Sequence, residues 1–409
     1  MTTAVAAVFF LVYLGMILGG LPFLQLDRTG VALLGAIALI GMGAVTPQEA
    51  ARSVHLPTIL LLFSFMVVSA QLRLGGFYPW VTVKLAERRL SPPALLAAVV
   101  AVVAALSAVF SNDVVCLSVA PVLAAACSRR GLDPVPYLLA LACAANVGSA
   151  ATLIGNPQNM LIGSALRLSF AGYIAIAAVP VLLGLIATWA VIAGQARGRW
   201  HRPPQPAPPL DRRDEGGAAL NRWQSIKGLG VAAVLLVVFL FTGLPREVAA
   251  LTGAGLLLMS RRLHSNKMLG LVDWELLVLF TGLFVVNHAF ERTGLTAALV
   301  HDLARSGVEL ERPAPLFAAT VVLSNLVSNV PAVMLLLPVA TQPLAGPLLA
   351  LASTLAGNLF IVGSIANIIV VDAAARRGTP IGWRAHARVG VPVTLLTLAI
   401  AAAYLAWRA

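Results

Sequence analysis

Long apolar stretches separated by short polar segments recur along the whole chain. A helix needs about 20 apolar residues to cross a bilayer. Stretches near this length predict complete crossings at residues 5–24, 31–45, 56–72, 170–193, 229–244, 248–259, 276–289 and 389–407. One soluble core cannot bury so many apolar segments, so the pattern predicts an all-α integral membrane protein.

Four further apolar segments form two pairs, each with a polar cluster in its middle. Residues 94–110 and 114–127 are separated by Ser111-Asn112-Asp113, and residues 315–327 and 330–341 by Ser328-Asn329. The segments are short for crossings, and so brief a polar connector fits a tip inside the membrane better than one at its surface. We therefore predict two re-entrant hairpins, 94–127 and 315–341.

Two more apolar segments contain residues that interrupt a helix. Residues 137–168 are interrupted by Gly155-Asn156-Pro157-Gln158-Asn159, and residues 348–375 by Gly363-Ser364-Ile365-Ala366-Asn367. Glycine and proline disrupt helical hydrogen bonding. In a membrane such a break persists only where protein or a water-filled cavity satisfies the freed backbone groups. Both segments are predicted to be broken helices.

The polar motifs occur twice, which indicates an internal repeat. At an offset of 217 residues the Ser-Asn pairs of the two hairpin tips coincide, and at an offset of 208 the glycine and the final asparagine of the two breaks coincide. Each half then holds five crossings, an odd number, so the halves are inverted repeats and the chain has the pattern of a transporter. The expected division is residues 1–193, a linker at 194–227, and residues 228–409.

Charge distribution predicts the orientation. Only 11% of the residues are charged, and the net charge is +12. The basic residues lie in short loops rather than on a soluble domain, so we expect no nucleic-acid partner. About three quarters of them fall on one side of the predicted topology, which the positive-inside rule makes cytoplasmic. We expect an inner (plasma) membrane location with both termini outside, a retained first helix, and a Pro-rich cytoplasmic linker.

The hairpin tips and breaks carry the candidate chemistry. Each exposes free amides at a helix N-terminus and free carbonyls at a helix C-terminus, which can hold an anion and a cation respectively. Hydroxyl and amide side chains at the same places can add ligands. The alternative is that these side chains only join helices together. Because they are duplicated at equivalent positions, we favour a binding site.

Asp113 is the most informative single residue, because an ionised carboxylate inside a membrane is costly unless it is paired or hydrated. It is a candidate proton carrier, sodium ligand or substrate partner, and the alternative is a structural carboxyl group. Its equivalent in the second hairpin is Val330. The expected binding residues are Ser111, Asn112, Asp113, Gly155, Asn156, Gln158, Asn159, Ser328, Asn329, Gly363, Ser364 and Asn367. A sodium ion is considered at Asn112, Asp113 and Asn159.

Other polar residues carry weaker hypotheses. Asp372 is one helical turn from Arg376, which favours an interfacial ion pair, and His288 near a span end favours packing. The three cysteines favour packing, since their spacing fits no metal site. No intramembrane protease motif or P-loop is present in the sequence, so we expect neither an enzyme nor a cofactor, and any uphill transport must use a proton or sodium gradient.

At these motifs the sequence resembles the ion transporter superfamily, which includes arsenite permeases, related sodium/proton antiporters, citrate carriers and divalent anion:sodium symporters. The resemblance rests on Phe110-Ser111-Asn112-Asp113, Ser328-Asn329-Val330-Pro331 and the two break motifs. It implies that two hairpins and two broken helices form a transport domain that moves against a scaffold as an elevator.

Dicarboxylate symporters carry Ser-Asn-Thr at both tips, so the Ser-Asn-Asp and Ser-Asn-Val tips are more similar to the arsenite permease and anion permease branch. The first hypothesis is an ion-coupled permease for a small oxyanion or metalloid, with Asp113 as the coupling residue. The second is a sodium/proton antiporter of the same fold. The third is a passive channel or non-transporting scaffold. A homodimer is among the assemblies considered.

Overall fold

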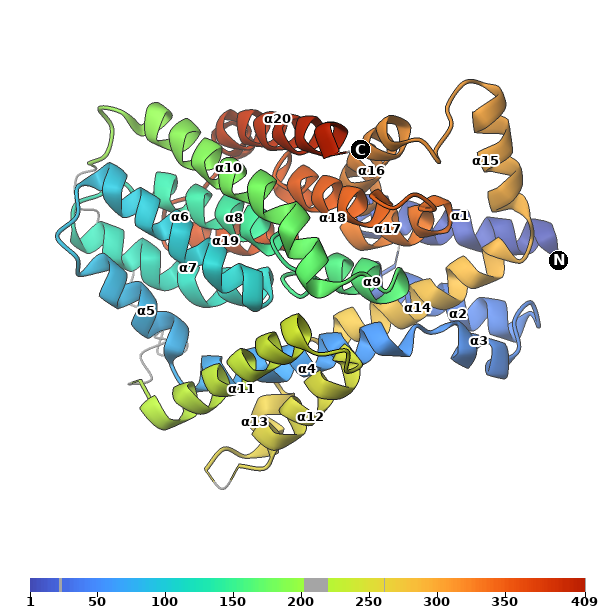
Figure 1. Ribbon diagram of the computed structural model, residues 1–409, viewed down its shortest axis with the longest axis horizontal. Coiled ribbons are helices and arrows are strands. Elements are labelled where there is room, and N and C mark those ends of the chain that lie inside the picture. The colour runs from blue at the N-terminus through green and yellow to red at the C-terminus, as the bar shows by residue number, and fades with distance from the viewer. Residues whose placement is uncertain (22–23, 202–219, 261, 409) are drawn as a thin grey trace.

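The computed structural model describes residues 1–21, 24–201, 220–260 and 262–408, and in this part of the chain it is almost entirely helical (Figure 1). The prolines of the predicted linker, Pro203 to Pro209, lie outside the described residues. Strand pairing in the described residues is limited to a short antiparallel pair, β1 (Gly20–Leu21) and β2 (Leu26–Asp27), and an isolated bridge between Leu132 and His201.

The two halves repeat the same order of elements. The first half contains α1 (Thr2–Leu18), α2 (Arg28–Gly41), α3 (Pro47–Ser53), α4 (Leu56–Leu74), α5 (Phe77–Ala86), α6 (Pro92–Val109), α7 (Asn112–Arg129), α8 (Pro134–Ser149), α9 (Pro157–Ala165) and α10 (Phe170–Ala196). The second contains α11 (Arg222–Phe241), α12 (Arg246–Leu258), α13 (Ser265–Leu269), α14 (Trp274–Glu291), α15 (Leu295–Arg305), α16 (Pro313–Val327), α17 (Asn329–Leu336), η1 (Leu337–Val339), α18 (Ala345–Ala356), η2 (Ile361–Gly363), α19 (Ile365–Arg376) and α20 (Trp383–Arg408). Each α-helix has a counterpart in the other half, from α1 and α11 to α10 and α20, whereas η1 and η2 occur in the second half alone among the described residues.

The predicted crossings, hairpins and broken helices all appear as helices, with corrected boundaries. The first crossing ends at Leu18 rather than Leu24, because Gly19 adopts a left-handed conformation with φ 82°. The helices α3, α5, α13 and α15 were missed, since they lie outside the long apolar stretches from which the crossings were predicted. Seven helices are long and apolar enough to span a membrane in the described residues.

The hairpin connectors are shorter than predicted. Asn112 and Asp113 belong to the first turn of α7, so only Phe110 and Ser111 separate the arms of the first hairpin. Asn329 begins α17, so Ser328 alone separates the arms of the second. The arms α6 and α7 have 18 residues each, which makes them longer than the sequence segments suggested.

Local capping explains where the second part of each broken helix begins. Asn156 accepts a hydrogen bond from the Asn159 backbone N–H, and Pro157 occupies the first helical position, where its missing N–H costs nothing. Ser364 caps α19 by accepting from the Ala366 N–H. Both breaks therefore end on a helix N-terminus that points its free amides into the protein.

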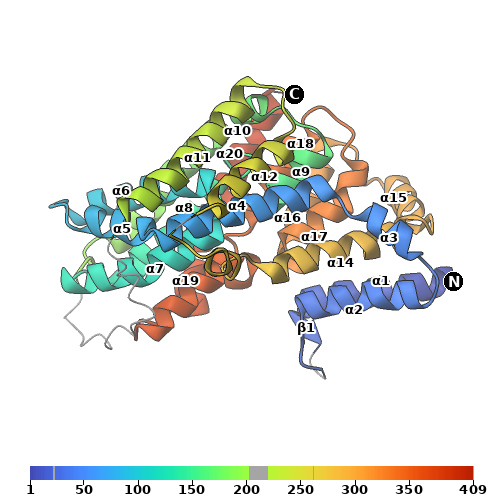
Figure 2. The same ribbon diagram turned by 90° about the horizontal axis from the view of Figure 1, so that it is seen from below.

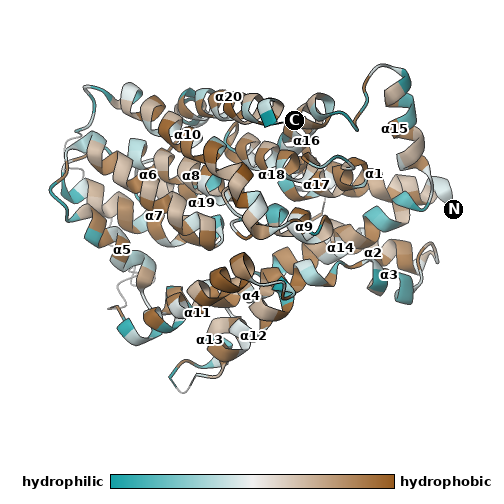
Figure 3. Cartoon of the chain, in the orientation of Figure 1, coloured by the Kyte–Doolittle hydropathy of each residue, from teal (hydrophilic) through white to brown (hydrophobic). Residues whose placement is uncertain are grey.

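Packing divides the helices into two groups. The hairpins, the broken helices, α10 and α20 pack on one another, while α4 packs on α12 and α2 packs on α14. Figure 2 shows α1, α2 and α14 together along one edge of the molecule. Helices α8 and α18 lie at the centre of the first group, with Tyr137 to Ser149 and Ala345 to Ala356 all buried. Hydrophilic residues gather at helix ends and in loops, as expected for a membrane protein (Figure 3).

Candidate substrate and ion site

The first hairpin tip contacts the first break directly. The Asn112 backbone N–H donates to the Gly155 carbonyl at 3.3 Å. Gly155 has no room for a side chain, because a Cβ there would lie 2.3 Å from the Ser149 carbonyl oxygen and 2.7 Å from the Ser107 carbonyl oxygen. The glycine is required so that hairpin and break can approach this closely.

Asn146 of α8 links the first tip to the second break. Its Oδ1 accepts from Asn112 Nδ2 at 3.1 Å and from the Ser364 hydroxyl at 2.9 Å. Its Nδ2 donates to Asn358 Oδ1 at 2.8 Å and to Asn367 Oδ1 at 3.1 Å. All the hydrogen-bonding capacity of this buried amide is used, and three of its four partners belong to the other half.

Thr354 of α18 makes the corresponding link in the other direction. Its hydroxyl oxygen accepts from Asn156 Nδ2 at 3.1 Å and from Gln158 Nε2 at 3.3 Å, and the hydroxyl lies 3.4 Å from Asn159 Oδ1. Asn159 also donates to the Thr152 carbonyl at 3.0 Å. Asn156, Gln158 and Asn159 were predicted as site residues, and the structure brings them together around a residue that was not.

Asn146 and Thr354 were therefore missed by the sequence reasoning. Each lies nine positions before the glycine of its break, Gly155 or Gly363, within a helix that is otherwise almost wholly apolar. A polar residue at the same repeat position in both halves was the available signal. That signal is a single residue in each helix before the break, outside the glycine- and asparagine-containing motifs of the breaks themselves.

The second tip lies against the second break. Asn329 Nδ2 is 3.3 Å from the position that a Cβ on Gly357 would take, and Gly363 has Asn325 Oδ1 at 3.2 Å from its own Cβ position. Ser328 adopts φ 78° and ψ 159°, a backbone region that is populated almost only by glycine. Ser111, its counterpart, has an unstrained φ of −52°, so the two tips differ in backbone as well as in sequence.

Several buried polar atoms around the tips have no hydrogen-bond partner among the described residues. They are Asn112 Oδ1, Asn325 Oδ1, Asn329 Oδ1 and Asn358 Nδ2. An unsatisfied buried polar atom costs about 1–3 kcal/mol. The three Oδ1 acceptors and the Nδ2 donor can bind an ion or a small hydroxylated molecule.

Asp113 lies beside this network and is half-buried. Its carboxylate makes no hydrogen bond or ion pair within the described part of the chain. Asn112 and Asn159 hydrogen-bond to different partners, so the structure does not join them and Asp113 through shared contacts. A sodium site at Asn112, Asp113 and Asn159 stays a prediction.

The weaker hypothesis of an ion pair at Asp372 is confirmed. Asp372 pairs with Arg376, with 2.9 Å between Oδ2 and Nε.

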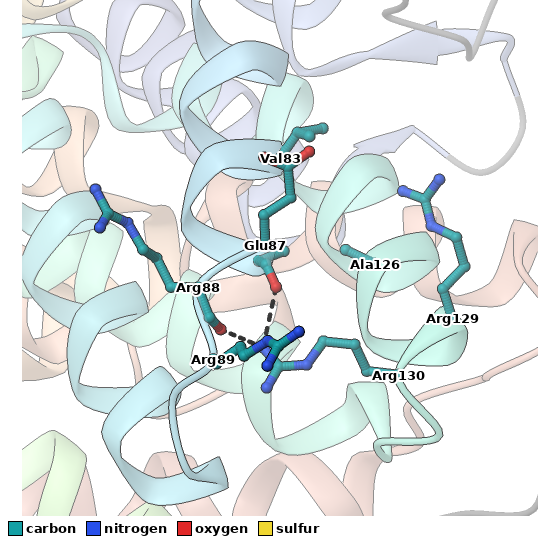
Figure 4. Close-up of a pocket in the computed structure, with 8 residues that line it drawn as sticks. Val83, Glu87, Arg88, Arg89, Ala126, Arg129 and Arg130 are labelled. Carbon is teal, nitrogen blue, oxygen red and sulfur yellow. Dashed lines mark hydrogen bonds between the residues drawn. The ribbon is translucent and has the colours of Figure 1, made fainter.

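A cavity of about 420 Å³ lies away from this polar centre, between the end of α5 and the end of α7 (Figure 4). The guanidinium group of Arg130 points toward backbone carbonyl groups at this cavity. Its Nη1 donates to the Ala86 and Arg88 carbonyls at 3.0 and 3.2 Å, and its Nη2 to the Leu90 carbonyl at 2.9 Å. Arg88 and Arg129 extend away on opposite sides. Arg130 thus joins the base of the first hairpin to the segment that precedes it.

Comparison with known proteins identifies the family. The model of the citrate transporter family matches residues 9–356, which is most of the chain and includes the first hairpin, the first broken helix and the second hairpin. The chain belongs to the citrate transporter family. It is a multi-span membrane transporter of this family, in line with the resemblance seen in the sequence motifs.

Individual proteins of similar sequence and one solved structure of similar fold give further context. The chain is 30% identical to the silicon efflux transporter LSI3 of Oryza sativa subsp. japonica, covering 93% of this chain and 92% of that one. It is 24% identical to the putative transporter arsB of Dictyostelium discoideum, with 92% and 87% covered. The crystal structure of the Alcanivorax borkumensis YdaH transporter matches with a TM-score of 0.57 at 16% identity, covering 99% and 97%, which shows a common fold.

Proposed function

We propose that this chain is a secondary active transporter of a small oxyanion or hydroxylated metalloid, such as arsenite or antimonite, coupled to a proton or sodium gradient. The observation that carries the proposal is the convergence of the first hairpin tip and both breaks on one buried network of amides and hydroxyls, with the second tip packed against Gly357 and Gly363. In the described residues this network includes Asn112, Asn146, Asn156, Asn159, Thr354, Asn358, Ser364 and Asn367.

The chemistry of the network favours a substrate with little or no charge. The side chains bonded to Asn146 and Thr354 are amides and hydroxyls, with no guanidinium or ammonium group among them. A multiply charged anion would have to lose its hydration without a compensating cation. A neutral hydroxide such as arsenous acid presents both donors and acceptors, and amides satisfy both.

Asp113 is the proposed coupling residue. It follows Asn112 directly at the start of α7, close to the network yet not bonded to it. A carboxyl group in this position can take up a proton or a sodium ion without first breaking an internal ion pair. The second hairpin has the buried Val330 at the equivalent place, so coupling falls to the first half.

Alternating access is proposed to occur by an elevator movement. The moving group would be the hairpins, the broken helices, α10 and α20, and the scaffold would contain α2, α4, α12 and α14, in keeping with how these helices pack. The face that carries the ends of α5 and α7, with its arginines, is proposed to be cytoplasmic.

Flux into proteoliposomes tests the proposal. Arsenite, silicic acid and citrate would each be offered to the reconstituted protein under an imposed proton gradient and, separately, a sodium gradient. Wild-type protein is expected to concentrate arsenite or silicic acid in a saturable manner under one of the two gradients. Asp113→Asn is expected to keep downhill flux and to lose concentrative uptake, since the amide cannot bind the coupling ion.

Asp372→Asn is the matched control, because this exposed acid forms only a surface ion pair with Arg376 and its loss should leave uptake unchanged. Sodium-for-proton exchange without flux of any of the three probes would instead support the antiporter. Flux that never saturates would support a channel. Concentrative uptake by Asp113→Asn would remove that residue from the coupling mechanism.

A further inference from the structure

The last helix of each half places one hydrogen-bond donor on the break of the same half. The Tyr173 hydroxyl of α10 donates to the Ala150 carbonyl at 2.7 Å, and His386 Nε2 of α20 lies 3.1 Å from the Asn358 carbonyl oxygen. Tyr173 and His386 are each the fourth residue of their helix. Ala150 and Asn358 each lie five positions before the glycine of the break, so the two contacts are equivalent in the repeat.

The partner atom determines which nitrogen of the histidine carries hydrogen. A carbonyl oxygen only accepts, so Nε2 must be the protonated nitrogen of the neutral ring. Nδ1 then holds a free lone pair, and it has no hydrogen-bond partner among the described residues although His386 is only 1% exposed. This nitrogen can take up a proton without disturbing the bond to Asn358. A phenol has no such second position, so Tyr173 cannot do the same.

Among the described residues, the helices packed on α20 supply no acid that would pair with a protonated His386 ring. Helix α20 packs on α8, α10 and α18. The titratable side chains on these three helices are Tyr137, Cys143 and Tyr173, and α18 and residues 357–364 have none. On α20 itself, Arg384 and Arg388 are exposed on other faces. A proton on Nδ1 would therefore act on the Asn358 carbonyl rather than on a neighbouring carboxylate.

We propose that His386 is a positioning residue that holds the second break and tightens this hold when Nδ1 takes up a proton from the aqueous phase, whereas Tyr173 holds the first break independently of protonation. A charge-assisted hydrogen bond is about twice as strong as a neutral one. Asn358 also accepts from Asn146, so a firmer Asn358 backbone restrains the network that joins both halves. The proposal rests on the proposed function, in which this network binds the substrate.

Hydrogen–deuterium exchange of the purified full chain tests the positioning role without requiring transport. The two breaks serve as references for each other. His386→Leu removes the bond to Asn358 and should speed amide exchange in residues 357–364 by roughly fivefold. Tyr173→Phe removes the bond to Ala150 and the bond accepted from Asn159, and should speed exchange in residues 150–156 by at least as much. His386→Gln can still donate from its amide and should restore wild-type exchange near pH ~8.

Protonation is tested by comparing pH ~5 with pH ~8, a range wide enough to include a buried histidine that is charged only in mild acid. In the wild type, exchange in residues 357–364 should slow at the lower pH relative to residues 150–156, which corrects for the intrinsic pH dependence of exchange. His386→Gln should lose this relative slowing. Equal behaviour of the two breaks in the wild type, or an unchanged response in His386→Gln, would overturn the proton step even if the leucine variant fails to fold.

A transport measurement separates this inference from the proposed function. With arsenite as the probe, His386→Gln should flatten the dependence of KM on pH while leaving the maximal rate near that of the wild type. Saturable uptake with an unchanged pH profile of KM would refute the role of His386 and leave the transporter assignment standing. Lack of flux for every probe would count against the proposed function, while the exchange data would still decide the positioning role.

Discussion

Asn146 and Thr354 hold equivalent positions in the two halves, and each hydrogen-bonds to the broken helix of the opposite half. Asn146 reaches Ser364 and Asn367, and Thr354 reaches Asn156 and Asn159. The breaks are therefore stabilised across the repeat interface as well as by bonds within their own half. Such reciprocal contacts allow non-helical backbone to exist at this depth in a membrane protein.

Removing Asn146 should destabilise the protein more than removing Thr354. Asn146→Ala removes one hydrogen bond from each of four buried polar side chains, whereas Thr354→Val mainly removes one from Asn156 and one from Gln158. We therefore expect losses of about 3–5 and about 1–3 kcal/mol respectively. Thermal unfolding of the purified protein measures the order. Asn266→Ala, at an exposed position on α13, is the control and should not shift the melting temperature. Equal shifts for Asn146→Ala and Thr354→Val would contradict the central place of Asn146.

Alanine at the two break glycines should have graded effects. A Cβ on Gly155 would lie 2.3 Å from a backbone oxygen, while one on Gly363 would meet its nearest atom at 3.0 Å. Backbone must move in the first case, and a small adjustment suffices in the second. Gly155→Ala should yield little folded protein, and Gly363→Ala should fold with a reduced melting temperature. Size-exclusion profiles and melting curves provide the measurement, and a well-folded Gly155→Ala would show that hairpin and break are less closely packed.

Glycine at the second tip should stabilise the protein. Ser328 occupies a region of φ and ψ that costs a non-glycine residue about 1–3 kcal/mol. Ser328→Gly removes this strain at an entropic cost of about 0.5–1 kcal/mol, so the melting temperature should rise slightly. Ser111→Gly, at an unstrained position, should lower it. If both substitutions lower the melting temperature, the Ser328 backbone is not strained.

Arg130 should be required for the structure between the first hairpin and α5. Arg130→Ala removes three hydrogen bonds to backbone carbonyls, and Arg130→Lys cannot reproduce the planar fork that makes them. Both variants should speed hydrogen exchange in residues 84–91 severalfold. Arg129→Ala, one position away on an exposed side chain, is the matched control and should leave exchange unchanged. Similar exchange in all three variants would argue that the bonds contribute little.

The sequence predicted the helical membrane fold, the repeat and most elements, because apolar length and helix-breaking residues are strong local signals. Ser111, Asn112, Gly155, Ser328, Asn329 and Gly363 were found from duplicated motifs, and the structure sets them at the tips and breaks. The predicted hairpin connectors were too long, because Asn112 and Asn329 start helices and do not belong to the connecting loops.

Contacts between the halves were beyond local patterns. Asn146 and Thr354 are single polar residues in apolar helices, and their partners are about 200 positions away. The role of His386 depends on a carbonyl that the sequence does not mark. These contacts depend on how α8, α18 and α20 pack on one another. The periodicity of apolar residues within a helix does not specify that packing.

The cross-half bonds have a consequence for biogenesis. The first break contains Asn156, whose amide donates to Thr354, a residue that is synthesised almost 200 positions later. During translation the first half therefore enters the bilayer with part of its polar interior unmatched. We expect water to occupy these unmatched groups until α18 arrives, so the polar interior of the first half is completed only once the second half is in place.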